Sequence, residues 1–169
     1  MQKKLLISLT LASIMLIGCA NNDTKPTTKK FERFQTVAIE KTTMLQSGKD
    51  KYSCPECGMK LPMFYKTNHS ATSNGKVKQY CSIHCLVEDK SIKKSNIKDM
   101  KVVAIDSLKF ISVKDAIYVV GSEKKGTMSG LSKYAFEGRM SARRFVKEHQ
   151  GRVMSFDEAY EYALKDFAH

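Results

Sequence analysis

The stretch that decides the fold is residues 116–154, which read AIYVVGSEKKGTMSGLSKYAFEGRMSARRFVKEHQGRVM. Its pattern predicts a strand at 116–121, a Gly- and Lys-rich loop at 123–130, a strand at 133–137, a helix at 141–149 and a short strand at 152–154. A short run of β-branched and aromatic residues between loop-forming residues is typical of a strand. The stretch therefore predicts one unit with the order strand, loop, strand, helix, strand.

The same order of elements occurs roughly sixty residues earlier, which indicates an internal repeat. The first copy is predicted as a strand at 63–65, a polar turn at 68–75, a strand at 77–80, a helix from the N-cap Ser82 to about 93 and a strand at 101–106. Because the two copies mix strands and helices, the predicted fold class is α+β.

A last helix follows the second copy. Ser155 and Glu158 form a capping box, which marks a helix N-terminus. Apolar residues then fall on one face at helical spacing: Phe156, Ala159, Tyr160, Ala163, Leu164 and Phe167. We expect this C-terminal amphipathic helix to be structural.

The composition is that of one globular domain. The chain has 169 residues, of which 42% are hydrophobic, with only 9 Gly and 3 Pro, so collagen and disorder are excluded. Its formal net charge of +12 indicates an anionic neighbour such as a membrane surface, an acidic protein or a nucleic acid.

The first residues are predicted to be a targeting signal. Lys3 and Lys4 precede a thirteen-residue uncharged stretch, 5–17, that is too short to span a bilayer. The following Leu16-Ile-Gly-Cys19 resembles the lipobox of bacterial lipoproteins, in which the cysteine is lipidated. This predicts a signal peptide at 1–18, a lipidated Cys19 with a flexible tether at 19–50, and a folded domain at 51–169. It also predicts a lipid-anchored protein on the periplasmic side of a bacterial membrane, without a nucleic-acid partner.

Once Cys19 is lipidated, four thiols remain, and they carry the chemistry: Cys54, Cys57, Cys81 and Cys85. They form Cys-x2-Cys, a spacer of 23 residues, and Cys-x3-Cys. Three interpretations are open from this spacing. The thiols can pair as structural disulfides in an oxidising compartment, bind a structural zinc ion as an S4 tetrahedron, or bind the soft ion Cu(I).

Met59 favours copper, because zinc does not use methionine whereas thioethers select Cu(I). If residues 57–59 are extended, Cys57 and Met59 point to the same side and can touch one ion. Core packing is the alternative role for Met59. His84 is a possible additional ligand or a solvated residue of the helix, and His69 and His169 are expected to face solvent.

Several ordered segments resemble the NosL family of copper lipoproteins associated with nitrous oxide reductase maturation. The resemblance runs from about Cys54 to Phe156, in addition to the lipobox. Its segments are Cys57-Gly-Met59, Gln79-Tyr-Cys-Ser82, Ala116-Ile-Tyr-Val-Val-Gly-Ser122, Lys125-Gly-Thr-Met128, Tyr134-Ala-Phe136, the helix with Ala142 and Phe145, and Gly151-Arg-Val-Met-Ser-Phe156.

The resemblance implies a fold of two ββαβ repeats with separate small sheets, also seen in the organomercury lyase family. It implies Cu(I) binding through Cys57, Met59 and Met128, and copper donation to the reductase. Gly126 and Gly130 are expected to let the loop around Met128 open and close. Cys54, Cys85 and His84 are additions to the family pattern, which could bind a second metal, widen the copper site or form a disulfide.

We therefore expect a monomeric metallochaperone and no enzyme, since the sequence shows no nucleophile–base pair and no phosphate-binding loop. Two rivals remain. One is a zinc-bound or disulfide-linked module that binds another protein. The other is an enzyme in which Cys57 and Cys81 cleave a carbon–metal bond, although fold alone does not imply function.

Overall fold

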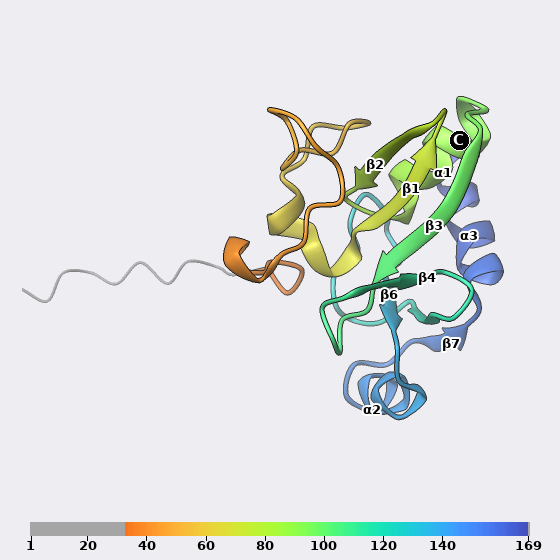
Figure 1. Ribbon diagram of the computed structural model, residues 1–169. Coiled ribbons are helices and arrows are strands. Elements are labelled where there is room, and N and C mark those ends of the chain that lie inside the picture. Colours follow the sequence, from red (N-terminus) through yellow and green to blue (C-terminus); the bar gives the residue numbers. More distant parts are fainter. Residues whose placement is uncertain (1–32, 169) are drawn as a thin grey trace, which may run out of the picture. The chain divides into compact units, whose positions relative to one another are not determined.

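The computed structural model describes residues 33–168 and contains two antiparallel sheets with three main helices (Figure 1). The first sheet has the strand order β2-β1-β3-β4. Its strands are β1 (His69–Ser73), β2 (Lys76–Tyr80), β3 (Ile97–Val103) and β4 (Phe110–Ser112). Between β2 and β3 the chain forms α1 (Ile83–Val87), which continues as the π-helix η3 (Glu88–Ile92).

The second sheet has the order β6-β5-β7, with α2 between its last two strands in sequence. Its elements are β5 (Ile117–Val120), β6 (Lys133–Phe136), α2 (Arg139–His149) and β7 (Arg152–Met154). In both sheets the first strand of the repeat lies between the second and the third. The predicted pair of ββαβ repeats with separate small sheets is therefore confirmed, and β4 is an unpredicted extra strand.

The start of the first repeat differs from the prediction. Residues 63–65 are not a strand but lie in the 3-10 helix η2 (Leu61–Thr67), which has a proline at its start. The predicted polar turn at 68–75 is instead β1, followed by a tight turn at Asn74 and Gly75. Both turn residues have positive φ, 49° and 80°, the pattern that Asn-Gly favours in two-residue hairpins.

The fold also begins earlier than predicted. The described residues 33–50 belong to the compact unit and not to a tether. Gln35 and Val37 are buried, and a short 3-10 helix, η1 (Ile39–Lys41), follows. The cause is specific contacts that composition does not reveal: Val37 N–H donates to Pro62 O (3.0 Å) and Lys66 N–H to Gln35 O (3.2 Å).

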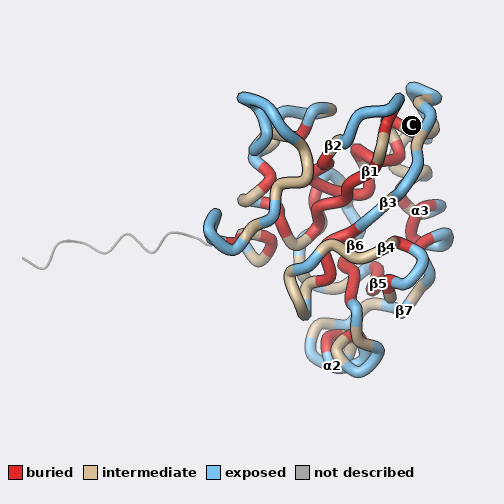
Figure 2. Tube along the Cα trace, viewed as in Figure 1, coloured by how far each residue is buried: buried red, intermediate tan, exposed pale blue. Residues whose placement is uncertain are grey.

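The C-terminal helix α3 (Phe156–Leu164) confirms the predicted capping box at Ser155 and Glu158. It buries Phe156, Ala159, Tyr160 and Ala163 and ends in the 3-10 helix η4 (Lys165–Phe167). Its buried face and the thiol-bearing helix α1 belong to one hydrophobic cluster, which also includes Tyr118 of β5. Figure 2 shows buried residues along β1, β5 and β6. This shared core fixes the position of α1, which contains Cys85 and begins just after Cys81.

One buried polar contact joins the two sheets. His69 Nε2 lies 3.0 Å from Tyr118 Oη, and both side chains are fully buried. The prediction that His69 faces solvent is therefore wrong, because β1 is a central strand and not a loop.

Candidate metal centre

The first pair of thiols is presented by a tight turn. Cys54 N–H donates to Met59 O (2.9 Å), and Gly58 N–H donates back to Cys54 O (2.8 Å). Gly58 has φ of +75°, a conformation that costs a residue with a Cβ free energy, so glycine is favoured at this position. The segment 57–59 is therefore bent and not extended. The argument that an extended backbone points Cys57 and Met59 to one side does not apply.

The second pair of thiols comes from the start of α1. Ser82 is the N-cap residue, as predicted, although its side chain makes no capping hydrogen bond. Cys81 lies just before the helix and Cys85 in its first turn, four residues apart, a spacing that brings side chains together on a helix. The hydroxyl of Thr67 donates to Cys81 O (2.8 Å), which ties this arm to the end of η2.

The four cysteines meet at one point. All their Sγ atoms lie within 4.8 Å of one another, with 3.5 Å between Cys57 and Cys81 and 3.7 Å between Cys81 and Cys85. For a tetrahedral thiolate site with metal–sulfur bonds of about 2.3 Å, neighbouring sulfurs lie about 3.8 Å apart. Over residues 33–168 this is the one group of His, Cys, Asp and Glu side chains arranged to hold a metal ion.

The four thiols are free, and they differ in exposure. Cys54, Cys81 and Cys85 are buried, whereas Cys57 is exposed. Hydrogen bonds from Cys81 and Cys85 lower the pKa of Cys54 to about 2. Because these two thiols donate to the Cys54 thiolate, their own pKa values are raised. Cys54 is thus the thiol of the group most readily ionised, and a bound metal cation would favour ionisation of the others.

Lys78 links the two pairs of thiols, which we call the first arm (Cys54 and Cys57) and the second arm (Cys81 and Cys85). Lys78 Nζ lies 3.0 Å from Glu56 Oε1 and 2.8 Å from Asp89 Oδ2. Glu56 stands between the two cysteines of the first arm, and Asp89 lies four residues after Cys85. Asp89 also accepts a hydrogen bond from Tyr80 Oη (2.7 Å), and a second lysine, Lys93, contacts Glu56.

These charged residues were not identified from the sequence. Two acidic residues were the available signal. Glu56 lies inside the Cys-x2-Cys turn, and Asp89 lies one helical turn after Cys85. A partner for both could only be found from the pairing of β2 with the rest of the fold.

His84 lies outside the thiol group. Its ring stacks on Phe167 with centroids 4.2 Å apart, and its Nδ1 lies 3.9 Å from Asp166 Oδ2. Its side chain is only 15% exposed, so the expectation of a solvated histidine is wrong. Burial lowers the pKa of His84. The ring therefore packs α1 against the C-terminal segment.

The loop that carries Met128 is held more firmly than predicted. Lys125 O accepts hydrogen bonds from Gln35 Nε2 and from Tyr134 Oη. The buried Thr127 hydroxyl lies 2.9 Å from Thr67 Oγ1, whose hydroxyl also reaches Cys81 O. Met128 follows directly and is 41% exposed. The loop is thus connected to the thiol group through one hydroxyl pair.

Gly126 supports a closed loop. A Cβ at this position would lie 2.7 Å from Ser129 O, so the backbone passes too closely for any side chain. Met59 is partly buried and packs against the main core. The ligand set Cys57, Met59 and Met128 stays a prediction, as do the lipidation of Cys19 and the exposure of His169, both of which lie outside the described residues.

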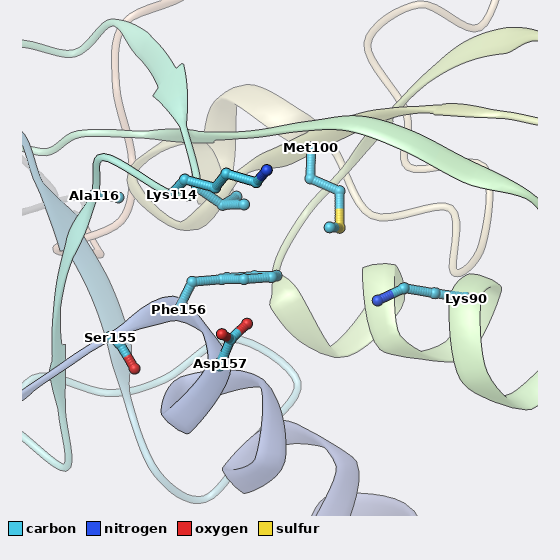
Figure 3. A pocket seen from close by; sticks show the side chains of 8 residues that line it. Lys90, Met100, Lys114, Ala116, Ser155, Phe156 and Asp157 are labelled. Atoms are coloured by element: carbon cyan, nitrogen blue, oxygen red, sulfur yellow. The ribbon is translucent and has the colours of Figure 1, made fainter.

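A hollow of about 350 Å³ lies elsewhere, between the N-terminus of α3 and the first sheet (Figure 3). Lys90 and Lys114 point toward each other across Met100 and Phe156. Its lining has one thioether and no thiol, so it offers no comparable site for a soft metal ion. Within residues 33–168, no helix is both long and apolar enough to cross a bilayer.

The fold and the thiol group define a small α+β metal-binding protein. The NosL family model matches residues 46–164, so the chain belongs to the NosL family, as the sequence segments indicated. The crystal structure of the copper chaperone NosL from Shewanella denitrificans resembles this chain with a TM-score of 0.53 and 24% sequence identity, covering 67% of this chain and 92% of that chain. This likeness shows the shared fold. Among curated proteins, none matches the chain.

Proposed function

We propose that this protein is a lipid-anchored Cu(I) chaperone on the periplasmic side of a bacterial membrane, and that it delivers copper to nitrous oxide reductase. The observation that carries the copper proposal is the group of four thiols within 4.8 Å. Thiolates are soft ligands, which select Cu(I), zinc and iron–sulfur clusters. Membership of the NosL family and the fold shared with a copper chaperone favour copper among these.

Exposure of Cys57 supports delivery as well as storage. The three buried thiols would hold the ion, and Cys57 is the one sulfur of the group that an incoming ligand can approach from solvent. In the transfer step a copper–sulfur bond to Cys57 breaks as a bond to the acceptor's ligand forms. By resemblance to the family, Met59 and Met128 are proposed as copper ligands together with Cys57.

A structural zinc site is the second candidate. The sulfur–sulfur distances of 3.5 and 3.7 Å fit a closed tetrahedral site, in which zinc would stabilise the fold and nothing would be delivered. Such an ion contributes to folding free energy, because the unfolded chain has no preformed site.

Competition titrations of the fully reduced protein distinguish these functions. A Cu(I) chelator complex and a zinc indicator are each titrated against the wild type, Cys57→Ser and Cys85→Ser. We expect Cu(I) to bind more tightly than zinc, and both variants to weaken Cu(I) binding by tenfold or more. A site made only of Cys57, Met59 and Met128 would leave Cys85→Ser unaffected.

Tighter binding of zinc than of Cu(I), together with unfolding when zinc is removed, would contradict the chaperone proposal. Circular dichroism of each metal-free variant is the control, because loss of the fold would also weaken metal binding. Cys57 is the safer position, since its exposed side chain contributes little to the core.

A further inference from the structure

Helix α2 presents a strongly cationic face to solvent. Its inner side buries Ala142 and Phe145 against the second sheet. The outer side carries four exposed cations, which are Arg139, Arg143, Arg144 and Lys147. None of these four forms an ion pair with another residue of the described range 33–168. One exposed acid, Glu148, lies on the same helix, and Met140 beside the cations is 70% exposed.

The chain leading to Cys19 enters the fold beside this helix. Phe34 packs against Phe145 and His149 of α2, with ring centroids 6.0 and 6.4 Å away. Two further cations, Lys66 and Lys124, lie 4.3 and 5.5 Å from the centroid of the Phe34 ring. The cationic surface therefore continues from α2 to the point where the N-terminal segment begins.

The N-terminal segment limits how far this surface can lie from a membrane. Cys19 precedes Arg33 by 14 positions. Even a fully extended chain of that length spans at most about 50 Å. A lipid at Cys19 would thus keep the first described residues within about 50 Å of the bilayer, so that α2 can reach it. An anionic surface attracts Lys and Arg once they approach within about a Debye length.

We propose that the outer face of α2 lies on the anionic headgroups of the membrane to which the lipid anchors the protein. This inference rests on the proposed lipidation of Cys19 and adds a second, electrostatic contact to it. The lipid holds the protein at the membrane, and the basic surface adds an electrostatic contact with anionic headgroups. The exposed Met140 gives the same face an apolar side chain at headgroup level.

This contact would orient the metal centre. Figure 1 shows α2 at the lower end of the fold and α1, which carries Cys85, near the upper end beside β1 and β2. With α2 on the bilayer, α1 would lie toward the end of the fold away from the membrane, where a soluble acceptor can approach. The cations of α2 would then set the orientation of the protein on the membrane. Their contact with the headgroups requires no bound metal ion.

The test uses the metal-free, unlipidated chain from residue 20. The buried clusters are formed by described residues of the compact unit, far along the chain from Cys19, so we expect this chain to fold without the lipid. Sedimentation with vesicles of phosphatidylcholine alone, or mixed with phosphatidylglycerol, measures partitioning at low and high salt. Arg143→Gln/Arg144→Gln removes two charges from α2. Lys98→Gln/Lys101→Gln removes two exposed charges from β3 and is the matched control.

We expect binding to the phosphatidylglycerol vesicles only, weakened by salt. The α2 variant should bind roughly 10- to 30-fold less, because each cation near the surface contributes on the order of fivefold. The β3 variant should change binding by about twofold or less, since its charges lie outside the proposed contact face on α2. Equal losses in both variants, or no binding to anionic vesicles, would overturn the proposal.

A third outcome would also overturn it. If the α2 variant binds vesicles normally but slows copper transfer to the acceptor, the helix docks on an acidic protein and not on lipid. Because the vesicle assay contains no copper, its failure leaves the metal titrations unaffected, and the two proposals are tested separately.

Discussion

Replacing Lys78 by methionine removes the cation that contacts both buried acids beside the thiols, Glu56 and Asp89. The change leaves Glu56 and Asp89, whose side chains are 4% and 1% exposed, without their shared partner. Each keeps a second contact, Glu56 with Lys93 and Asp89 with Tyr80. Removing one partner of a buried ion pair costs about 3–5 kcal/mol. The remaining contacts and the 28% exposure of Lys78 reduce that figure, and we expect a loss of about 2 kcal/mol in the free energy of unfolding.

Urea denaturation of the reduced, metal-free protein measures this loss directly. Lys93→Met is the comparison variant, because its side chain is 49% exposed and contacts Glu56 and Glu88 but not Asp89. It should cost less than Lys78→Met, because a largely exposed cation contributes little and Glu56 keeps Lys78 as its partner. Cu(I) affinity should fall in Lys78→Met, since the arms are no longer held together. Two results would show that Lys78 does not hold the two arms together. One is a loss of stability in Lys93→Met as large as in Lys78→Met, and the other is unchanged stability and Cu(I) affinity in Lys78→Met.

Three further predictions concern His69, Cys19 and Met128. Burial lowers the pKa of His69 from 6.5 to about 4, so the fold favours its neutral form. The contribution of His69 to stability should be fully present above pH 6.5 and fall by roughly 3 kcal/mol as pH drops to about 4. Urea denaturation across this range should show a clearly smaller loss in His69→Asn than in the wild type, the variant keeping the contribution of His84, whose pKa burial also lowers. Cys19→Ser should release the protein from the membrane fraction after carbonate washing, and a protein that stays there at wild-type level would refute the lipobox. Met128→Leu should weaken Cu(I) binding less than Cys57→Ser does, with the fold retained because Leu nearly matches Met in volume; equal or larger loss in a competition titration would contradict a minor role for the thioether.

The repeat was predictable because it depends on local patterns. The apolar run 117–120 and the capping box at Ser155 are specified by adjacent residues, and both elements form where expected. β1 was not predictable in the same way. Its residues are polar and are paired on both sides by β2 and β3, and Ser70 Oγ donates to Lys78 O across the hairpin. The Asn-Gly turn was the available signal for that hairpin.

The spacing of the cysteines predicted that they form one group, but it did not predict which kind of site they form or which thiol is exposed. Spacing left disulfides, zinc and copper open, and it could not show that Cys57 is exposed while its three partners are buried. That difference arises because the Cys54 turn packs its first cysteine into the core and leaves the second on the surface. His84 was misjudged for a related reason: its packing partner, Phe167, is 83 positions away in the sequence.

Direct transfer of copper tests the central proposal most closely. The unlipidated chain from residue 20, loaded with Cu(I), is mixed with copper-free nitrous oxide reductase in the presence of a Cu(I) chelator that traps any free ion. We predict that the reductase gains copper before the chelator does, and that Cys57→Ser slows this step. If the chelator intercepts all the copper first, the protein stores or scavenges copper and does not deliver it.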